Sequence, residues 1–134
     1  MPKDYDLLFS EAQLITASAA STNYLNPGVV QNLGNAAFVE VNVTTVLDSA
    51  GEAATLTVGI QVDDNSSFTS ATTLVSSGTI VEADLVAGKQ ILIPIPFNRI
   101  PTEYYMRLYY TAGTENFTSG AVTAHIVFNP QTNS

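Results

Sequence analysis

The chain has 134 residues, of which twelve are Asp or Glu, four are Lys or Arg, one is His and none is Cys. This length suits one domain, and a formal net charge of -8 argues against nucleic acid and anionic membrane surfaces as partners, because both require clustered Lys and Arg. The lack of cysteine excludes a disulfide scaffold, a thiolate zinc site and a cysteine nucleophile.

The first residues contain one short apolar run, Leu7-Leu8-Phe9. This run is too short for the apolar core of a signal peptide or for a spanning helix. We therefore expect a protein that is made in the cytoplasm and carries no recognisable export signal. Residues 1–12 are interpreted as an N-terminal arm that becomes ordered on docking, with Leu7, Leu8 and Phe9 as candidate contacts to a partner.

Beyond this arm, apolar and polar residues alternate with the period of two that is typical of strands. In chain order the pattern predicts a short strand at 13–17, another at 24–25 before the turn Asn26-Pro27-Gly28, long strands at 38–47 and 54–62, a hairpin of 73–76 and 79–83 around Ser77-Gly78, and long strands at 89–95, 104–111 and 121–128.

Eight or nine short strands without a sustained helical period predict an antiparallel sandwich or barrel. Pro94, Pro96 and Pro101 place the segment 94–101 at a sheet edge or in a long crossover, because proline cannot donate to a sheet ladder. A long crossover favours a jelly roll. We therefore expect an all-β, antiparallel jelly-roll sandwich of about eight strands over residues 13–128, followed by a polar tail at 129–134.

Acidic residues supply two candidates for chemistry. The run Asp63-Asp64-Asn65-Ser66 offers oxygens to calcium, but it lacks the spacing and the closing Glu of an EF-hand. Glu82 and Asp84 lie two apart on a predicted strand and therefore share a face, as a glycosidase pair would. Both acidic groups are better explained as solvent-exposed residues, the first in a loop and the second on a strand face. We assign no metal ligand to them.

The single histidine, His125, lies on the face of its predicted strand opposite Val122, Ala124 and Ile126. A catalytic triad would need a nearby nucleophile and an orienting acid, and the chain has no Gly-x-Ser-x-Gly elbow. The scattered glycines form neither a dinucleotide fingerprint nor a phosphate loop. We therefore predict no catalytic residue, no cofactor and no enzyme activity, and we interpret His125 as a surface or interface residue.

Tyrosines concentrate on the predicted strand 104–111. The alternation places Tyr104 and Tyr110 on the core side of the strand. Tyr105 and Tyr109 flank Arg107 on the outer side. Tyrosine and arginine are favoured at protein interfaces, where they combine a large contact area with polar groups. Tyr105, Arg107 and Tyr109 are therefore the main candidates for a protein interface, and a sugar-binding platform or an ordinary surface remain the alternatives.

Three stretches in order resemble a known family. They are Leu8-Phe9-Ser10-Glu11-Ala12-Gln13 with Ile15-Thr16-Ala17 and Ala19-Ala20-Ser21-Thr22; Ala53-Ala54-Thr55-Leu56-Thr57-Val58 with Asp63-Asp64 and Phe68-Thr69-Ser70; and Tyr109-Tyr110-Thr111 with Phe117-Thr118-Ser119-Gly120, Val122-Thr123-Ala124 and Asn129-Pro130-Gln131-Thr132. Together they resemble the capsid cement (decoration) proteins of tailed bacteriophages, of the type found on a Bordetella phage. The chain departs from this resemblance at residues 98–103.

The resemblance implies a jelly roll on the outer surface of the virion capsid that bridges neighbouring major capsid proteins. It implies two partners, the major capsid protein and a second copy of the chain, with a homodimer favoured and a trimer as the alternative. It implies no catalytic residue and no cofactor. A carbohydrate- or receptor-binding module of a phage particle is the alternative function, and a small β-sandwich enzyme comes third.

Overall fold

The computed structural model describes residues 7–31, 37–96, 99–101 and 103–128. In these residues the regular structure is almost entirely β. Its elements are β1 (Leu8–Leu14), β2 (Ala19–Ala20), α1 (Pro27–Gln31), β3 (Ala37–Asp48), β4 (Thr55–Asp63), β5 (Thr72–Ser76), β6 (Ile80–Val81), the 3-10 helix η2 (Glu82–Asp84), β7 (Gln90–Pro94), β8 (Tyr105–Gly113) and β9 (Ser119–Phe128). No helix in this described part has the length and apolar character needed to cross a bilayer.

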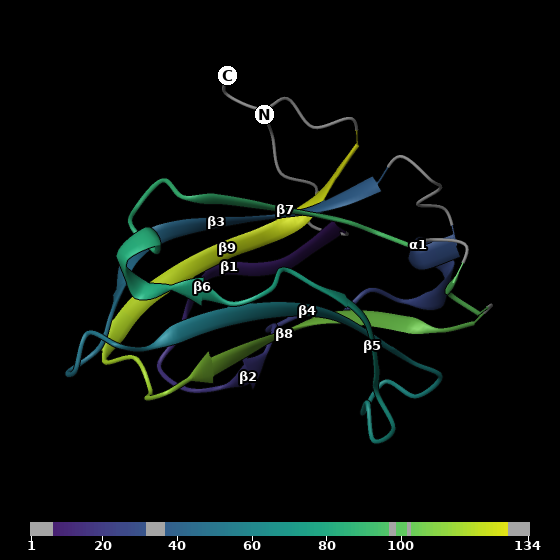
Figure 1. Cartoon of the computed structure of the whole chain (residues 1–134). Coiled ribbons are helices and arrows are strands. Elements are labelled where there is room, and N and C mark those ends of the chain that lie inside the picture. Colours follow the sequence, from purple (N-terminus) through teal and green to yellow (C-terminus); the bar gives the residue numbers. More distant parts are fainter. Residues whose placement is uncertain (1–6, 32–36, 97–98, 102, 129–134) are drawn as a thin grey trace.

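The strands form two sheets that stack as two layers (Figure 1). The first sheet has the order β1-β9-β3-β7, and the second has the order β2-β8-β4-β5 with β6 also pairing with β4. Neighbouring strands run antiparallel, and most connections cross from one sheet to the other. This is the strand order of a jelly roll. The predicted all-β sandwich is confirmed, with nine strands in place of about eight.

The five long strands predicted from alternation are confirmed as β3, β4, β7, β8 and β9. Each places a set of alternating apolar side chains on the face that looks toward the other sheet, where they are buried in one continuous core. The strongest example is β4, whose inward side chains are wholly buried: Leu56, Val58, Ile60 and Val62. A period of two therefore selects the core face directly, because successive side chains of a strand point to opposite sides.

The predicted hairpin around Ser77-Gly78 is wrong. Both β5 and β6 pair with β4, at residues 59–62 and 55–56 respectively, so they form one interrupted edge strand. Ser77 holds the interruption against β4, because its amide donates to the Val58 carbonyl (2.8 Å) and its hydroxyl accepts from the Val58 amide (3.0 Å). Gly78 has a φ of +78°, which glycine adopts without strain. Ser-Gly therefore marks a local irregularity here and not a chain reversal.

The first strand begins earlier than predicted. β1 covers Leu8–Leu14 and pairs with β9, and it contains two register shifts that break the regular alternation. The predicted arm boundary at residue 12 is therefore wrong, because residues 8–12 belong to the first sheet. Residues 1–6 and the predicted tail at 129–134 lie outside the described residues.

The weak strand predicted at 24–25 is reduced to one bridge between Leu25 and Met106. The turn predicted after it begins the short helix α1. Pro27 occupies the first helical position, where its missing N–H costs no hydrogen bond, and the Val30 amide donates to the Asn26 carbonyl (3.0 Å). The buried Val30 side chain anchors this helix in the core.

The proline-rich segment combines the two predicted roles. β7 is an edge strand of the first sheet and ends at Pro94. The chain then crosses to β8 in the second sheet, and its described part includes Pro96 and Pro101. Residues 97, 98 and 102 lie outside the described residues, and two of them, 98 and 102, fall within the stretch where the family resemblance breaks down.

A buried polar contact joins the two sheets. The wholly buried Tyr110 of β8 shares a hydrogen bond of 2.8 Å with the Ser10 hydroxyl of β1. Ser10 itself donates to Gln13 Oε1 (2.6 Å), so the Tyr110 hydroxyl is the donor in the shared bond. Burial raises the pKa of the Tyr110 phenol, which keeps this donor protonated. Tyr110 therefore lies in the core, as the alternation predicts.

Candidate protein interface

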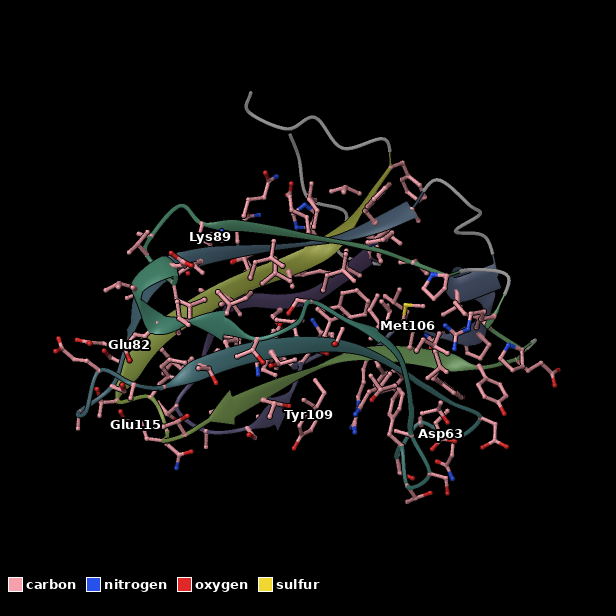
Figure 2. The ribbon with its side chains drawn as sticks, viewed as in Figure 1. Asp63, Glu82, Lys89, Met106, Tyr109 and Glu115 are labelled. Atoms are coloured by element: carbon pink, nitrogen blue, oxygen red, sulfur yellow. The ribbon has the colours of Figure 1, made fainter. Side chains whose placement is uncertain are left out.

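The side chains of β8 alternate between a face toward the core and an outer face. Its inward side chains are wholly buried: Met106, Leu108 and Tyr110. The alternating residues Tyr105, Arg107 and Tyr109 are half-buried on the opposite face of the second sheet, and Figure 2 shows Tyr109 pointing away from the first sheet. They lie opposite Asp63, Gln61 and Gly59 of β4, respectively.

Two further aromatic rings join these side chains. Tyr24 packs edge-on against Tyr105, with 5.6 Å between ring centroids, and against Phe68, at 6.0 Å. The Arg107 guanidinium carbon lies 4.4 Å from the centroid of the Phe68 ring and 5.7 Å from that of Tyr109. We call Tyr24, Phe68, Tyr105, Arg107 and Tyr109 the Tyr–Arg patch. It combines a delocalised cation with rings that attract it electrostatically.

The loop of residues 63–70 places Phe68 in this patch. Asp63 closes the loop, because its two carboxylate oxygens accept the amides of Asp64 (2.7 Å) and Ser70 (2.8 Å). These backbone hydrogen bonds, that of Ser70 first, lower the pKa of the Asp63 carboxyl. Phe68 has a φ of +53°, an unusual conformation for a bulky residue, and its amide donates to the Asn65 carbonyl (3.0 Å). Asp63 therefore shapes this loop, which accounts for the acidic run without a calcium ion.

The structure separates the six predicted interface residues into two groups. Tyr105, Arg107 and Tyr109 lie together on the outer face, as predicted. Leu8 and Phe9 do not, because both are buried within this chain, and Phe9 is part of the core. Leu7 packs against the same core. The second group is therefore withdrawn as an interface, and contact of the first group with a partner stays a prediction.

Sequence patterns missed Tyr24 and Phe68 as members of the patch. Tyr24 precedes α1 and Phe68 lies in the 63–70 loop, so neither belongs to a strand whose alternation would place it on a face. The available signal was an isolated aromatic residue within a polar turn, Asn65-Ser66-Ser67-Phe68-Thr69. Such a residue needs apolar cover from elsewhere in the chain, but the sequence does not identify what covers it.

A second cluster lies at one end of the sandwich, where Figure 2 shows Glu82 and Glu115 near each other. The Ser49 hydroxyl hydrogen-bonds with Glu82 and lies 3.2 Å from Glu115 Oε2. Glu115 also accepts the amides of Gly51 (3.0 Å) and Ala53 (2.9 Å). Glu115 therefore closes the β3–β4 turn. The described residues contain no group of three or more His, Cys, Asp or Glu side chains arranged to hold a metal ion.

The predicted pairing of Glu82 with Asp84 on one strand face is wrong, because both residues lie in the 3-10 helix η2. A strand ends at Val81, directly before them. The side chain that shares a hydrogen-bonding partner with Glu82 is Glu115, which comes from a different loop. The partner that Glu82 and Glu115 share is the Ser49 hydroxyl, which links their two segments.

Acid is expected to weaken the Glu115 contact. Its backbone hydrogen bonds, to Ala53 first and then Gly51, favour the charged carboxylate and lower its pKa. A lowered folded-state pKa stabilises the protein above the unfolded pKa, and this stability is lost as pH falls toward the folded value. Melting temperatures of E115Q should lie below wild type at pH 7, and the difference should shrink below about pH 4.

The control for this experiment is E52Q, which removes one charge from the same turn, where the Glu52 side chain is exposed. This variant should follow the wild-type dependence on pH. A constant difference between E115Q and wild type from pH 7 to pH 3 would contradict the role of the charged Glu115.

His125 lies on the outer face of the first sheet, as its alternation predicts. Its Nε2 atom is 3.3 Å from Glu40 Oε2 on the neighbouring strand β3. Glu40 also accepts hydrogen bonds from the amide groups of Asn42 (3.1 Å) and Gln90. His125 therefore belongs to a network of side chains on three adjacent strands, and this network explains its position without a nucleophile.

A comparison with protein families gives a match over most of the chain. The model of the family described as Bbp16 matches residues 9–126, a span that runs from β1 into β9. The name of this family suggests a protein of a Bordetella phage. No curated protein matches the chain closely enough to count as a relative. The match covers the large majority of the chain and both sheets, so this protein is a member of the Bbp16 family.

Proposed function

We propose that this protein is a structural component of a tailed-phage particle. In this proposal it binds the outer face of the capsid and cements neighbouring major capsid proteins, without enzyme activity and without contact to nucleic acid or membrane. The observation that carries the proposal is the family match over residues 9–126, because that family is bacteriophage-related. The partners are the major capsid protein and a second copy of this chain.

The surface composition supports a role in assembly. Charged residues make up only 12% of the chain, about half the share usual in soluble domains, and Thr and Ser are abundant. The second sheet presents the Tyr–Arg patch on its outer face, and three Thr side chains of β4 and β8 lie beside it: Thr55, Thr57 and Thr111. Such a face buries area at low desolvation cost because it carries few charges.

Repetition provides the mechanism of cementing. A ligand that binds only the assembled state stabilises that state by mass action, and each copy adds its own contribution. Contacts that bridge two capsid proteins therefore resist their separation at every joint where a copy binds. The net charge of -8 also disfavours adhesion of the decorated shell to DNA and to anionic cell surfaces.

The proposal is tested by mixing the purified protein with shells of its parent phage that have been stripped of it. Size-exclusion chromatography with light scattering should show co-elution with the shells, at a copy number close to that of the major capsid protein. Light scattering of the protein alone gives its own oligomeric state. A protein that never co-elutes with shells would overturn the proposal.

The double variant Y105A/R107A is expected to reduce occupancy on stripped shells by at least ~10-fold, because it removes the centre of the patch. The variant should remain folded, since neither side chain belongs to the core cluster between the two sheets. The matched control is V46A/R99A, which removes one exposed apolar and one exposed arginine side chain elsewhere. Equal occupancy of the two double variants would contradict this location of the interface.

A glycan- or receptor-binding module is the second candidate function. The observation in its favour is the exposed Tyr24 ring beside Tyr105, because exposed aromatic rings are suited to stacking on sugars. The isolated protein would then bind an immobilised glycan and ignore stripped shells. A glycan array probed with wild type and with Tyr24→Ala separates this function from cementing.

A further inference from the structure

Within the part of the chain that the structure describes, Arg107 is held in place by neutral groups. Its Nε atom donates to Gln61 Oε1 at 2.8 Å on the neighbouring strand, and its guanidinium lies beside the rings of Phe68 and Tyr109. No Asp or Glu among the described residues forms a salt bridge with it. An arginine has five N–H donors in a planar fork, so the contact to Gln61 leaves the four donors of the terminal nitrogens.

The lack of an acidic partner for Arg107 among the described residues is unexpected in a chain of this composition. Asp and Glu outnumber Lys and Arg by twelve to four, yet the residue directly opposite Arg107 is Gln61. The next outward position of β4, Asp63, has a carboxylate, but both of its oxygens accept backbone amides of its own loop. The sheet therefore fixes the plane of the guanidinium without neutralising its charge.

We propose that Arg107 is the anchor of a carboxylate-binding site, and that its occupant is an Asp or Glu side chain of the capsid shell protein. This inference rests on the proposed function and specifies the chemistry of its partner. A carboxylate accepts two parallel N–H bonds from the guanidinium fork. The flanking rings limit access of water, which strengthens such a pair relative to one that is fully exposed.

The same geometry argues against a second copy of this chain as the occupant. In a two-fold contact each subunit contributes the same surface. A contact centred on the Tyr–Arg patch would therefore bring two Arg107 side chains together, and the five residues of the patch include no acid. A surface of different composition, with a carboxylate at its centre, is complementary in charge.

Carbodiimide cross-linking tests this contact on shells. The reagent couples an amine to an adjacent carboxylate and does not couple a guanidinium, so R107K adds an amine at the proposed site. We expect stripped shells decorated with R107K to yield, after treatment and digestion, a peptide containing position 107 joined to an Asp or Glu of the shell protein. Wild type lacks this product, and R99K, with its amine at an exposed position of the crossover, is the matched control.

Binding measurements complete the test. R107M keeps an unbranched side chain but loses the charge, and its affinity for stripped shells should fall at least ~10-fold. R107K, which keeps the charge but loses the fork, should fall between R107M and wild type. R99M should stay within about twofold of wild type, because the exposed Arg99 lies outside the patch.

The outcomes separate this inference from the proposed function. If wild type binds shells and R107M binds them with the same affinity, the carboxylate site is overturned and cementing is left intact. A cross-link from position 107 to a second copy of this chain would overturn the assignment of the occupant. Failure of wild type itself to bind shells would overturn cementing, and with it the shell protein as the source of the carboxylate.

Discussion

Replacing Phe9 with alanine is expected to lower the free energy of unfolding of the isolated protein by about 3–5 kcal/mol. Phe9 is 0% exposed and belongs to the continuous core between the two sheets. Removing its ring therefore deletes a large buried apolar surface and leaves a cavity that neighbouring strands fill only in part. Urea unfolding followed by circular dichroism measures the effect.

Leu14→Ala is the matched control for Phe9→Ala, because Leu14 lies on the same strand and is 74% exposed. Its effect should stay below about 0.5 kcal/mol. A loss below about 1 kcal/mol for Phe9→Ala would restore the interpretation of residues 1–12 as an arm outside the domain. With that result, Phe9 would return as a candidate for contact with a partner.

Gly120→Ala is expected to cost about 3 kcal/mol or more, from two causes. Gly120 has a φ of +134°, a conformation that residues with a side chain rarely adopt. A Cβ atom at this position would also lie 2.7 Å from the Cα atom of Leu47 and 2.1 Å from its Cδ2 atom. Because a backbone atom is involved, a change of side-chain rotamer does not relieve the collision.

Gly28→Ala is the control for this substitution. An added Cβ at Gly28 meets no atom within 4 Å, and the residue lies in α1, where alanine is favoured over glycine. The free energy of unfolding should change by less than about 1 kcal/mol. Similar urea midpoints for the two variants would show that β3 yields at Leu47, contrary to the tight contact seen here.

The sequence was most informative where alternation is regular. In β4, in β8 and in β3 as far as Val43, every second residue is apolar, so the pattern predicted both the strand and its buried face. It failed for β1, where two register shifts interrupt the period and the buried Ser10 occupies a core position. It also failed at Ser77-Gly78, since turn-forming residues do not distinguish a chain reversal from an interruption within an edge strand.

The candidate interface was predictable only where it lies on a strand with regular alternation. Alternation on β8 was sufficient to place Tyr105, Arg107 and Tyr109 on one outer face. It did not identify Tyr24 and Phe68, because their positions depend on a helix start and on a loop closed by Asp63. These are contacts between segments distant in sequence, which no local pattern encodes.

The pairing of β1 with β9 has a consequence for synthesis of the chain. β9 is the sheet partner of β1, and their register joins Leu8 to His125. A ribosome makes the chain from its N-terminus, so β1 must wait for nearly all later strands before its own partner emerges. Such distant pairings slow folding. We therefore expect the first sheet to close only after β9 has been synthesised, with Phe9 accessible to chaperones and other nascent chains until then.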